Sequence, residues 1–314
     1  MNSGNQKSSK KALFASLVVL GFFVPAIIFF TGERGESIVS KKDFAPTKIN
    51  SNKIFQNLEL EAKSAIVWDI GGQKEIFGKN AEIQLPLASL SKVMMALVSL
   101  EHAPGGAIIS IKEDDLLEEG DSGLFLYERW RLRDLIDFSL AVSSNDGAKA
   151  IAGAVGSLFQ KETPLEAFVG LMNKKAGKLG LVQTYFTSPS GLDKDDIISG
   201  GNGSVRDMAV LFEYVLKNKP EIFKITAYPE SVFNSLDFSH EEENTNSGLL
   251  KKLPGVIASK TGFTDLAGGN LFVVFEPEPM RQIILGVLGS SLLGRFSDIE
   301  KLYLTTLDYL EIFE

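Results

Sequence analysis

Hydrophobic residues are arranged in distinct patterns along this 314-residue chain, and the first pattern is a long apolar run near the N-terminus. Residues 12–30 carry no charge, and the run is close to the roughly 20 residues that a membrane helix requires. Lysines precede the run, so the positive-inside rule predicts a cytoplasmic tail at 1–11 and a transmembrane signal-anchor at 12–31. A cleaved signal peptide is the alternative, and the folded part would then be secreted.

The remaining chain divides into a polar tether at 32–54 and a folded domain at 55–314. Alternating or continuous apolar segments typical of strands occur at both ends of this domain, at 64–69, 74–79, 256–260, 269–275 and 282–289. The region from about 120 to 220 has mainly helical periodicity, and Ser297 is a candidate cap for a last helix. We therefore expect an α/β (α+β) domain whose sheet takes strands from both ends.

Composition excludes several kinds of function. The net charge of −8 provides no overall positive field for a nucleic acid partner. The chain has no cysteine, which excludes disulfides, thiolate metal sites and cysteine nucleophiles. The two histidines, His102 and His240, lie in no recognisable motif, and we expect both at the surface. A Ser-His-Asp triad and a zinc peptidase site are therefore not predicted.

One candidate reaction centre is the pair Ser89 and Lys92, which opens a long apolar segment. If a helix begins here, residues three apart share a face and the two side chains lie within hydrogen-bonding range. A serine hydroxyl becomes a good nucleophile when a base takes its proton. A lysine can be that base if burial lowers its pKa, and the apolar residues that follow Lys92 predict burial.

Two further motifs follow along the chain. Ser143 and Asn145, separated by Ser144, lie between two predicted helices, where a hydroxyl can relay a proton and an amide can bind a carbonyl. Lys260-Thr261-Gly262 ends a predicted strand, where the ammonium and hydroxyl groups can bind a carboxylate. Gly262 is expected to let the substrate backbone approach the strand. Each motif alone is a weak signal.

The ordered set S-x-x-K, S-x-N and K-T-G is typical of penicillin-binding proteins and class A β-lactamases. With segments such as LPLASLSKVM and LAVSSNDGA, the chain resembles the low-molecular-mass penicillin-binding proteins that act as serine-type D-alanyl-D-alanine carboxypeptidases. The resemblance covers about residues 55–310. It implies a penicillin-recognition (β-lactamase-like) fold, with an antiparallel sheet flanked by helices and carrying a helical insertion.

The resemblance also implies a role for each motif residue. Ser89 would be the acylated nucleophile and Lys92 its general base. Ser143 would relay protons to the leaving D-alanine, and Asn145 would hold the substrate amide. The remaining roles concern the K-T-G strand: Lys260 and Thr261 would bind the terminal carboxylate, and the backbone N–H groups of Ser89 and Phe263 would form the oxyanion hole. Many relatives carry histidine where this chain has Phe263, and glycine where it has Ser144.

The implied activity is removal of the terminal D-alanine from peptidoglycan stem pentapeptides, with β-lactam antibiotics as covalent inhibitors and with no metal or cofactor. A D,D-endopeptidase of peptidoglycan cross-links has the same catalytic set and remains open. An inactive penicillin-binding scaffold is disfavoured because no motif residue is missing. A class A-like β-lactamase is also disfavoured, since residues 167–212 contain no glutamate to act as deacylating base. We expect turn or capping roles for the carboxylates of that segment, Asp193, Asp195, Asp196 and Asp207.

Overall fold

The computed structural model describes residues 52–120, 122–159 and 163–313. The predicted cytoplasmic tail, the predicted membrane segment and nearly all of the predicted tether lie outside these residues. Within the described ranges, no helix is both long enough and apolar enough to span a bilayer. A short helix, α1 (Asn52–Phe55), is the first described element, and Phe55 packs into the core.

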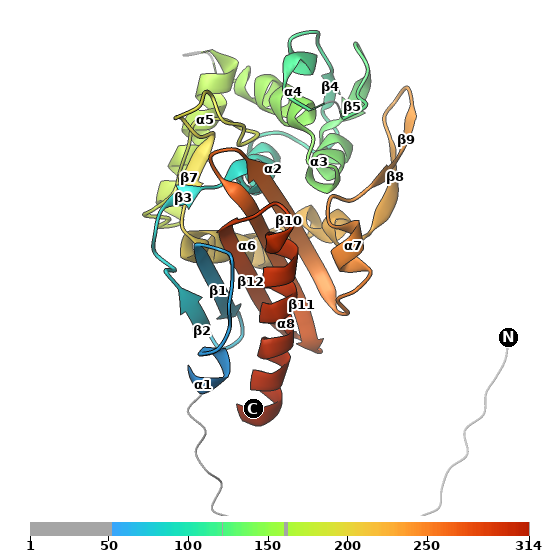
Figure 1. Cartoon of the computed structure of the whole chain (residues 1–314). Coiled ribbons are helices and arrows are strands. Elements are labelled where there is room, and N and C mark those ends of the chain that lie inside the picture. Colours follow the sequence, from blue (N-terminus) through green and yellow to red (C-terminus); the bar gives the residue numbers. More distant parts are fainter. Residues whose placement is uncertain (1–51, 121, 160–162, 314) are drawn as a thin grey trace, which may run out of the picture. The chain divides into compact units, whose positions relative to one another are not determined.

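A five-stranded antiparallel sheet forms the centre of the domain, as the sequence predicts (Figure 1). Its strand order is β10-β11-β12-β1-β2. The bounds are Ser64–Asp69 for β1, Lys74–Lys79 for β2, Val256–Thr264 for β10, Gly268–Glu278 for β11 and Arg281–Ser290 for β12. The strand nearest the N-terminus therefore pairs with the last strand of the domain, and β10 lies at one edge of the sheet.

One face of the sheet is covered by the long helix α8 (Gly294–Phe313), which crosses it in Figure 1. Alternate residues of β11, including Leu271 and Val273, are buried against it. The helix begins at Gly294, whose N–H donates to the hydroxyl of Ser291. The expectation that Ser297 caps this helix is therefore wrong, because a serine three residues before Gly294 already provides the acceptor.

The opposite face is covered by α6 (Val205–Asn218), which contacts β1 and β12, and α2 (Ser91–His102) packs against α6 in the same core. The intervening residues of β11, such as Phe272 and Val274, belong to this second core. Because side chains alternate along a strand, the single strand β11 contributes to both cores. Helix α2 is buried along most of its length, which agrees with its almost uninterrupted apolar sequence.

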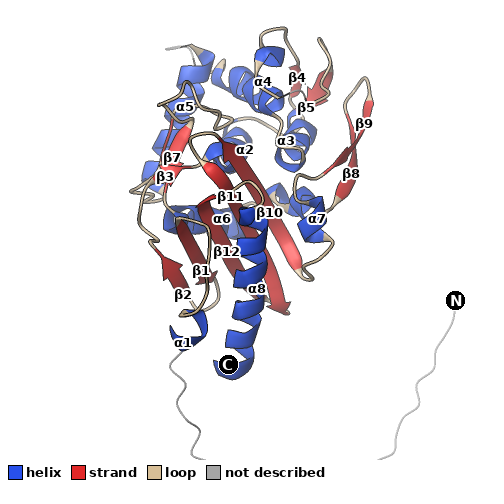
Figure 2. Ribbon diagram, in the orientation of Figure 1, coloured by secondary structure: helices blue, strands red, loops and turns tan. Residues whose placement is uncertain are grey.

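The middle of the chain forms the predicted helical insertion, which lies beyond one end of the sheet (Figure 2). Its helices are α3 (Leu132–Ala141), α4 (Asn145–Gly156) and α5 (Pro164–Lys178). The segment from 179 to 204 departs from the helical prediction. It runs in turns and in the short strands β6 (Tyr185–Phe186) and β7 (Gly201–Gly203), and the latter pairs with β3 (Leu85–Pro86).

The prediction that His240 is an exposed loop residue is wrong. It lies in β9 (Ser239–Glu243), which pairs with β8 (Glu230–Asn234) as a hairpin. His240 is only 7% exposed, and its Nε2 lies 2.7 Å from the carboxylate of Glu128. The run of glutamates made the segment look fully solvated, yet alternate residues of a strand face opposite sides. The other elements within the described residues are β4 (Ile108–Ser110), β5 (Arg129–Arg131), α7 (Ser247–Leu250) and four short 3-10 turns.

Candidate active site

Ser89 lies at the junction between the sheet and the helical insertion. It is in a 3-10 turn, Ala88–Leu90, that precedes α2, so it is not in the first α-helical turn as the sequence suggested. Ala88 has a φ of +49°, an uncommon conformation for a residue with a side chain. Ser89 remains partly exposed. The turn thus keeps the hydroxyl reachable while the helix behind it is buried.

Lys92 lies one turn along α2 and is fully buried. Its Nζ donates to Ser89 Oγ at 2.8 Å, to Asn145 Oδ1 at 2.6 Å and to the carbonyl oxygen of Ser190 at 2.9 Å. The last two oxygens can only accept hydrogen bonds. A neutral lysine amine has two N–H groups and one lone pair. When these two acceptors take its two N–H groups, the lone pair is left facing the Ser89 hydroxyl.

The surroundings of Lys92 favour this neutral form. Burial lowers the pKa of Lys92 from 10.5 to about 7, and the negative charge of Glu118 opposes that shift. Desolvation penalises the charged amine, which explains the direction. A large fraction of Lys92 is therefore unprotonated near neutral pH, so it can accept the proton of Ser89.

Asn145 begins α4, and both ends of its amide are already engaged. Its Oδ1 accepts from Lys92, and its Nδ2 donates to the carbonyl oxygen of Glu119 at 2.7 Å. The preceding Ser144 is the N-cap of α4 and accepts from the N–H of Gly147. The cap fixes the start of the helix and hence the position of Asn145. The second Nδ2 hydrogen of Asn145 is the one that a substrate carbonyl can use.

Ser143 and Lys260 form a second polar pair. Lys260 Nζ donates to Ser143 Oγ and to the carbonyl oxygen of Thr261, both at 2.9 Å. Ser143 has a φ of +63°, so it is a second non-glycine residue of this site in an uncommon conformation. Burial lowers the pKa of Lys260 well below 10.5, and the positive charges of Lys92 and Arg295 lower it further. A bound anion would stabilise the charged form of Lys260 and so counteract this lowering of its pKa.

The other K-T-G residues lie beside this pair on β10. Thr261 Oγ1 is 2.9 Å from Thr245 Oγ1. A Cβ atom at Gly262 would lie 2.9 Å from the carbonyl oxygen of Leu87 and 3.1 Å from the nitrogen of Ser89. The expected reason for this glycine was close approach of substrate. The structure gives a different reason: β10 packs directly against the turn that carries Ser89.

Phe263 follows Gly262 on the same strand, and 44% of the residue is exposed. It lines a cavity of about 420 Å³ together with residues of the loop after β6 and with Glu119. Its chain neighbour Gly262 packs against the backbone nitrogen of Ser89, which a Cβ atom at Gly262 would approach to 3.1 Å. The two N–H groups assigned to the oxyanion hole, those of Ser89 and Phe263, therefore belong to segments in direct contact.

Two groups in the site were not singled out from the sequence. Ser190 contributes its carbonyl oxygen, a group present in every residue, so only its place in the loop matters. Arg295 lies on α8, is 8% exposed, and donates from Nη1 to the carbonyl oxygen of Gly262 at 2.8 Å. Burial lowers the pKa of Arg295 to about 10, so it stays charged at neutral pH. No local pattern distinguishes this arginine from one on the surface.

Of the carboxylates of the 167–212 segment, Asp195 has the turn role that we predicted, but the prediction is wrong for Asp193 and Asp207, which bind other segments of the chain. Asp193 accepts from the N–H of Leu266 at 3.2 Å. Asp195 accepts from the N–H groups of Ile197 and Ile198. Asp207 accepts from the backbone of Gln183 and the hydroxyl of Thr184. Across the described ranges, no group of three or more histidine, aspartate and glutamate side chains is placed to hold a metal ion.

Several known proteins are similar to this chain in fold and in sequence. The family model of D-alanyl-D-alanine carboxypeptidase matches residues 50–291. D-alanyl-D-alanine carboxypeptidase DacB2 of Mycobacterium tuberculosis is 32% identical over 230 residues, which cover 72% of this chain and 74% of that protein. DacA of Escherichia coli is 31% identical over 260 residues, which cover 78% of this chain and 60% of that protein.

A solved structure gives the same result for the fold. Penicillin-binding protein D2 of Listeria monocytogenes, in its ampicillin-bound form, aligns with a TM-score of 0.69 and 29% identity. The alignment covers 80% of this chain and 99% of that one. The predicted penicillin-recognition fold, with its antiparallel sheet and helical insertion, is therefore confirmed.

Proposed function

The chain belongs to the D-alanyl-D-alanine carboxypeptidase family, and we propose that it releases the terminal D-alanine of peptidoglycan stem pentapeptides through an acyl-enzyme on Ser89. One observation carries the assignment of the nucleophile. The hydroxyl of Ser89 is 2.8 Å from a fully buried lysine whose pKa is lowered to about 7. A serine next to a lysine in this state is an activated nucleophile.

The first step forms an ester. Lys92 accepts the proton of Ser89 as the Oγ attacks the carbonyl carbon of the penultimate D-alanine. The oxyanion is bound by the backbone N–H groups of Ser89 and Phe263. The C–N bond then breaks, and the leaving amine takes a proton from Ser143, which is bonded to Lys260. Ser143 regains a proton from Lys260, while Lys92 holds the proton of Ser89. When water hydrolyses the ester, Lys92 returns its proton to Ser89 Oγ and one proton of the water passes to Lys260.

The same geometry supports a role in substrate binding for the second lysine. The terminal carboxylate of the substrate would lie against Lys260 and Thr261. Arg295 adds a positive charge behind the strand through its bond to the carbonyl oxygen of Gly262. An anion near Lys260 offsets the repulsion between these cations. This arrangement favours a substrate with a free C-terminal carboxylate, which is the substrate of a carboxypeptidase.

A D,D-endopeptidase is the second candidate, because relatives named D-alanyl-D-alanine endopeptidase match at 26–27% identity. Its substrate has an internal bond and does not require a free carboxylate beside Lys260. A β-lactamase is disfavoured because Asp195 and Asp207 are already bound to neighbouring groups of the protein. We therefore propose that penicillin acylates Ser89 and that the resulting ester is hydrolysed slowly.

The direct experiment compares two serine variants that lie two positions apart. Ser89→Ala should abolish both D-alanine release from a pentapeptide ending in D-Ala-D-Ala and covalent labelling by fluorescent penicillin. Ser91→Ala is the matched control, since the Ser91 hydroxyl is buried and makes no hydrogen bond within the described part of the chain. Labelling that persists in Ser89→Ala would place the nucleophile elsewhere.

We also propose that residues 12–31 anchor the protein in the cell membrane, with the catalytic domain outside the cytoplasm. The support is the charge-free apolar run in the sequence and the lysines that precede it. Membrane fractionation of the full-length chain tests this proposal. Recovery in the carbonate-soluble fraction, with an N-terminus beyond residue 24, would favour the cleaved signal peptide instead.

A further inference from the structure

An exposed cluster of aromatic side chains lies outside the catalytic machinery. The rings of Phe125 and Phe238 are in contact, with centroids 4.9 Å apart and planes tilted by 55°, yet the two residues remain 52% and 51% exposed. Tyr127, two residues further along, is 72% exposed. We call Phe125, Tyr127 and Phe238 the aromatic tip. Phe125 and Tyr127 come from the loop before β5, and Phe238 comes from the turn of the β8–β9 hairpin.

The backbone at Tyr127 has an unusual conformation. The N–H of Glu128 donates to the carbonyl oxygen of Phe125 at 3.1 Å, which closes a turn with Leu126 and Tyr127 at its corner. Tyr127 has a φ of +63°, where glycine or asparagine is the usual residue. Its N–H donates to the carbonyl oxygen of Ile111 at 2.8 Å. Because a bulky residue in this conformation is strained and its ring is exposed to solvent, we infer that the Tyr127 side chain has a functional role.

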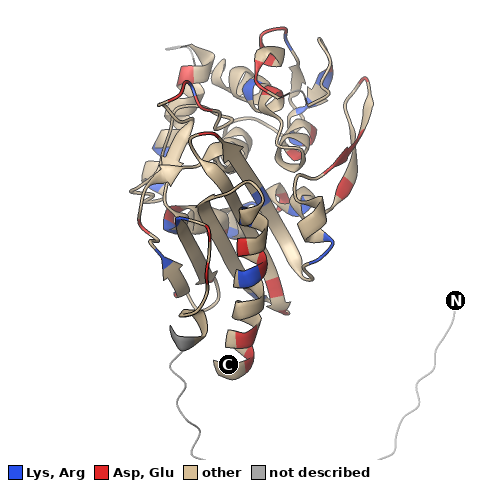
Figure 3. Ribbon diagram, viewed as in Figure 1, with Lys and Arg blue, Asp and Glu red and all other residues tan. Residues whose placement is uncertain are grey.

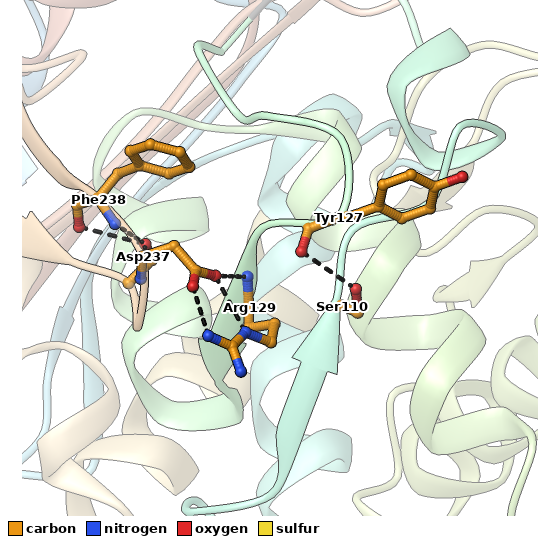
Figure 4. Close-up of polar contacts among 6 residues, drawn as sticks. Ser110, Tyr127, Arg129, Asp237 and Phe238 are labelled. Atoms are coloured by element: carbon orange, nitrogen blue, oxygen red, sulfur yellow. Dashed lines mark hydrogen bonds and ion pairs between the residues drawn. The ribbon is translucent and has the colours of Figure 1, made fainter.

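Several contacts fix the two segments of the tip to each other. Arg129 donates from its backbone, Nε and Nη2 to the carboxylate of Asp237, the residue next to Phe238. The N–H of Leu236 donates to the carbonyl oxygen of Arg129 at 2.7 Å. Figure 4 shows the Arg129–Asp237 pair beside Phe238, with the Tyr127 ring directed away from that pair. Rings held in place before binding lose little conformational entropy when a ligand arrives.

The loop that contains Ser122 connects the aromatic tip to the active site. Ser122 Oγ lies 2.6 Å from Ser144 Oγ, the cap between Ser143 and Asn145. Phe125 is the third residue after Ser122, so their Cα atoms are at most about 11 Å apart. The same loop provides the carbonyl oxygen of Glu119 that binds Asn145. A long substrate in the cleft therefore has the aromatic tip within reach.

The charges around the aromatic tip favour one kind of ligand. The β8–β9 hairpin that carries Phe238 has exposed carboxylates along its strands, including Glu230, Glu241 and Glu243, and Figure 3 shows acidic segments on this hairpin. These groups, with the net charge of −8, repel an anionic membrane surface. Carboxylates accept hydrogen bonds from hydroxyl groups, and aromatic faces pack against the C–H faces of sugar rings. A neutral saccharide chain offers both groups.

We propose that the aromatic tip binds the saccharide chain of polymeric peptidoglycan while a stem peptide of the same polymer occupies the cleft. This inference rests on the proposed function, because the polymer is the source of that peptide. The aromatic tip then makes the enzyme prefer polymer-attached peptides over free ones. It contributes to substrate binding and takes no part in the chemistry at Ser89.

The test compares two substrates with full-length protein: a free pentapeptide ending in D-Ala-D-Ala, and glycan strands that carry the same peptide. The double variant Tyr127→Asn, Phe238→Ser removes two rings, and asparagine tolerates the conformation of residue 127. On glycan strands, kcat/KM should fall by about threefold to tenfold for each ring removed. On the free peptide it should stay within about twofold of wild type. The control is Leu304→Ala, which removes another exposed apolar side chain, 60% exposed, on α8.

A second measurement needs no variant. Glycan strands stripped of their peptides should inhibit the wild-type reaction on the polymer more strongly than the reaction on free peptide. The proposal fails if the variant loses activity equally on both substrates, or on neither, or if stripped glycan does not compete. If binding to lipid vesicles depends on the aromatic tip, then the ligand of the tip is a membrane surface and not a saccharide. Absence of D-alanine release from either substrate by wild-type protein would instead refute the proposed function.

Discussion

Lys92 and Lys260 are both almost completely buried in one site, and burial lowers the pKa of each, but their neighbours differ. The further charge acting on Lys92 is that of Glu118, which raises its pKa. The further charges acting on Lys260 are those of Lys92 and Arg295, which lower its pKa. Lys92 also contacts Ser89, the proposed nucleophile, whereas Lys260 contacts Ser143.

This difference suits the two lysines to two functions, general base catalysis and carboxylate binding. A lysine with a pKa near 7 exchanges its proton at physiological pH and suits general base chemistry. A lysine crowded by other cations gains most when an anion arrives, which suits carboxylate binding. If the comparison is right, removal of Lys92 should slow acylation, and removal of Lys260 should weaken carboxylate binding. The charge of Glu118 should also change the pKa of Lys92.

The largest effect is expected for Lys92→Met, which keeps the volume of the side chain but cannot accept a proton. Acylation by penicillin should slow by roughly 10²- to 10⁴-fold, the range typical for loss of a general base. Stopped-flow or timed labelling measures the rate, and circular dichroism checks that the fold is retained. Acylation close to the wild-type rate would show that another group deprotonates Ser89.

The sequence predicted the sheet and the three motifs because both depend on local patterns. The five sheet strands have apolar alternation or apolar runs, and the S-x-x-K spacing follows from helical geometry. The contact of Lys92 with the carbonyl oxygen of Ser190 was not predictable in the same way. It joins segments 98 residues apart, and any residue can supply a carbonyl oxygen.

Other features were hidden because they arise from packing between distant segments. Arg295 becomes part of the site only because α8 brings it against the end of β10. His240 looked solvated among glutamates, but the hairpin turns it toward the buried Glu128. Gly262 was correctly identified as a position that needs close approach, but its neighbour is the Ser89 turn and not the substrate. Local sequence gives the residue type required, while tertiary packing determines which partner it meets.

A smaller effect is expected at Lys260, and it should appear as lost discrimination between substrates. Wild-type protein should prefer a peptide with a free terminal carboxylate over the matching amide by about 10- to 150-fold, the range for a hydrogen bond to a charged group. Lys260→Met should remove most of that preference and slow the acid more than the amide. The ratio of kcat/KM for the two peptides is the measurement. An unchanged ratio would remove Lys260 from carboxylate binding and favour endopeptidase action.

The smallest effect concerns the pH dependence of acylation. Only the unprotonated form of Lys92 can accept the proton of Ser89, so the acylation rate should rise with pH through a midpoint near 7. Glu118 raises the pKa of Lys92 because its negative charge stabilises the ammonium. Glu118→Gln should therefore lower that pKa and move the midpoint to lower pH. A shift between a few tenths of a unit and about one unit is expected for a charge that is neither in contact nor fully screened.

A matched carboxylate tests whether this shift is specific to Glu118. Glu118 and Glu166 line the same cavity of about 650 Å³, but only Glu118 acts on the pKa of Lys92. Glu166→Gln should leave the midpoint in place, because Glu166 is exposed and accepts a hydrogen bond from Thr163 at the start of α5. The pH profile of penicillin acylation distinguishes the two variants at low salt, where screening is weakest. A midpoint that moves equally in both would mean that the overall charge of the cavity acts on Lys92. A midpoint that rises in Glu118→Gln would contradict the sign of the interaction and weaken the distinction between the two lysines.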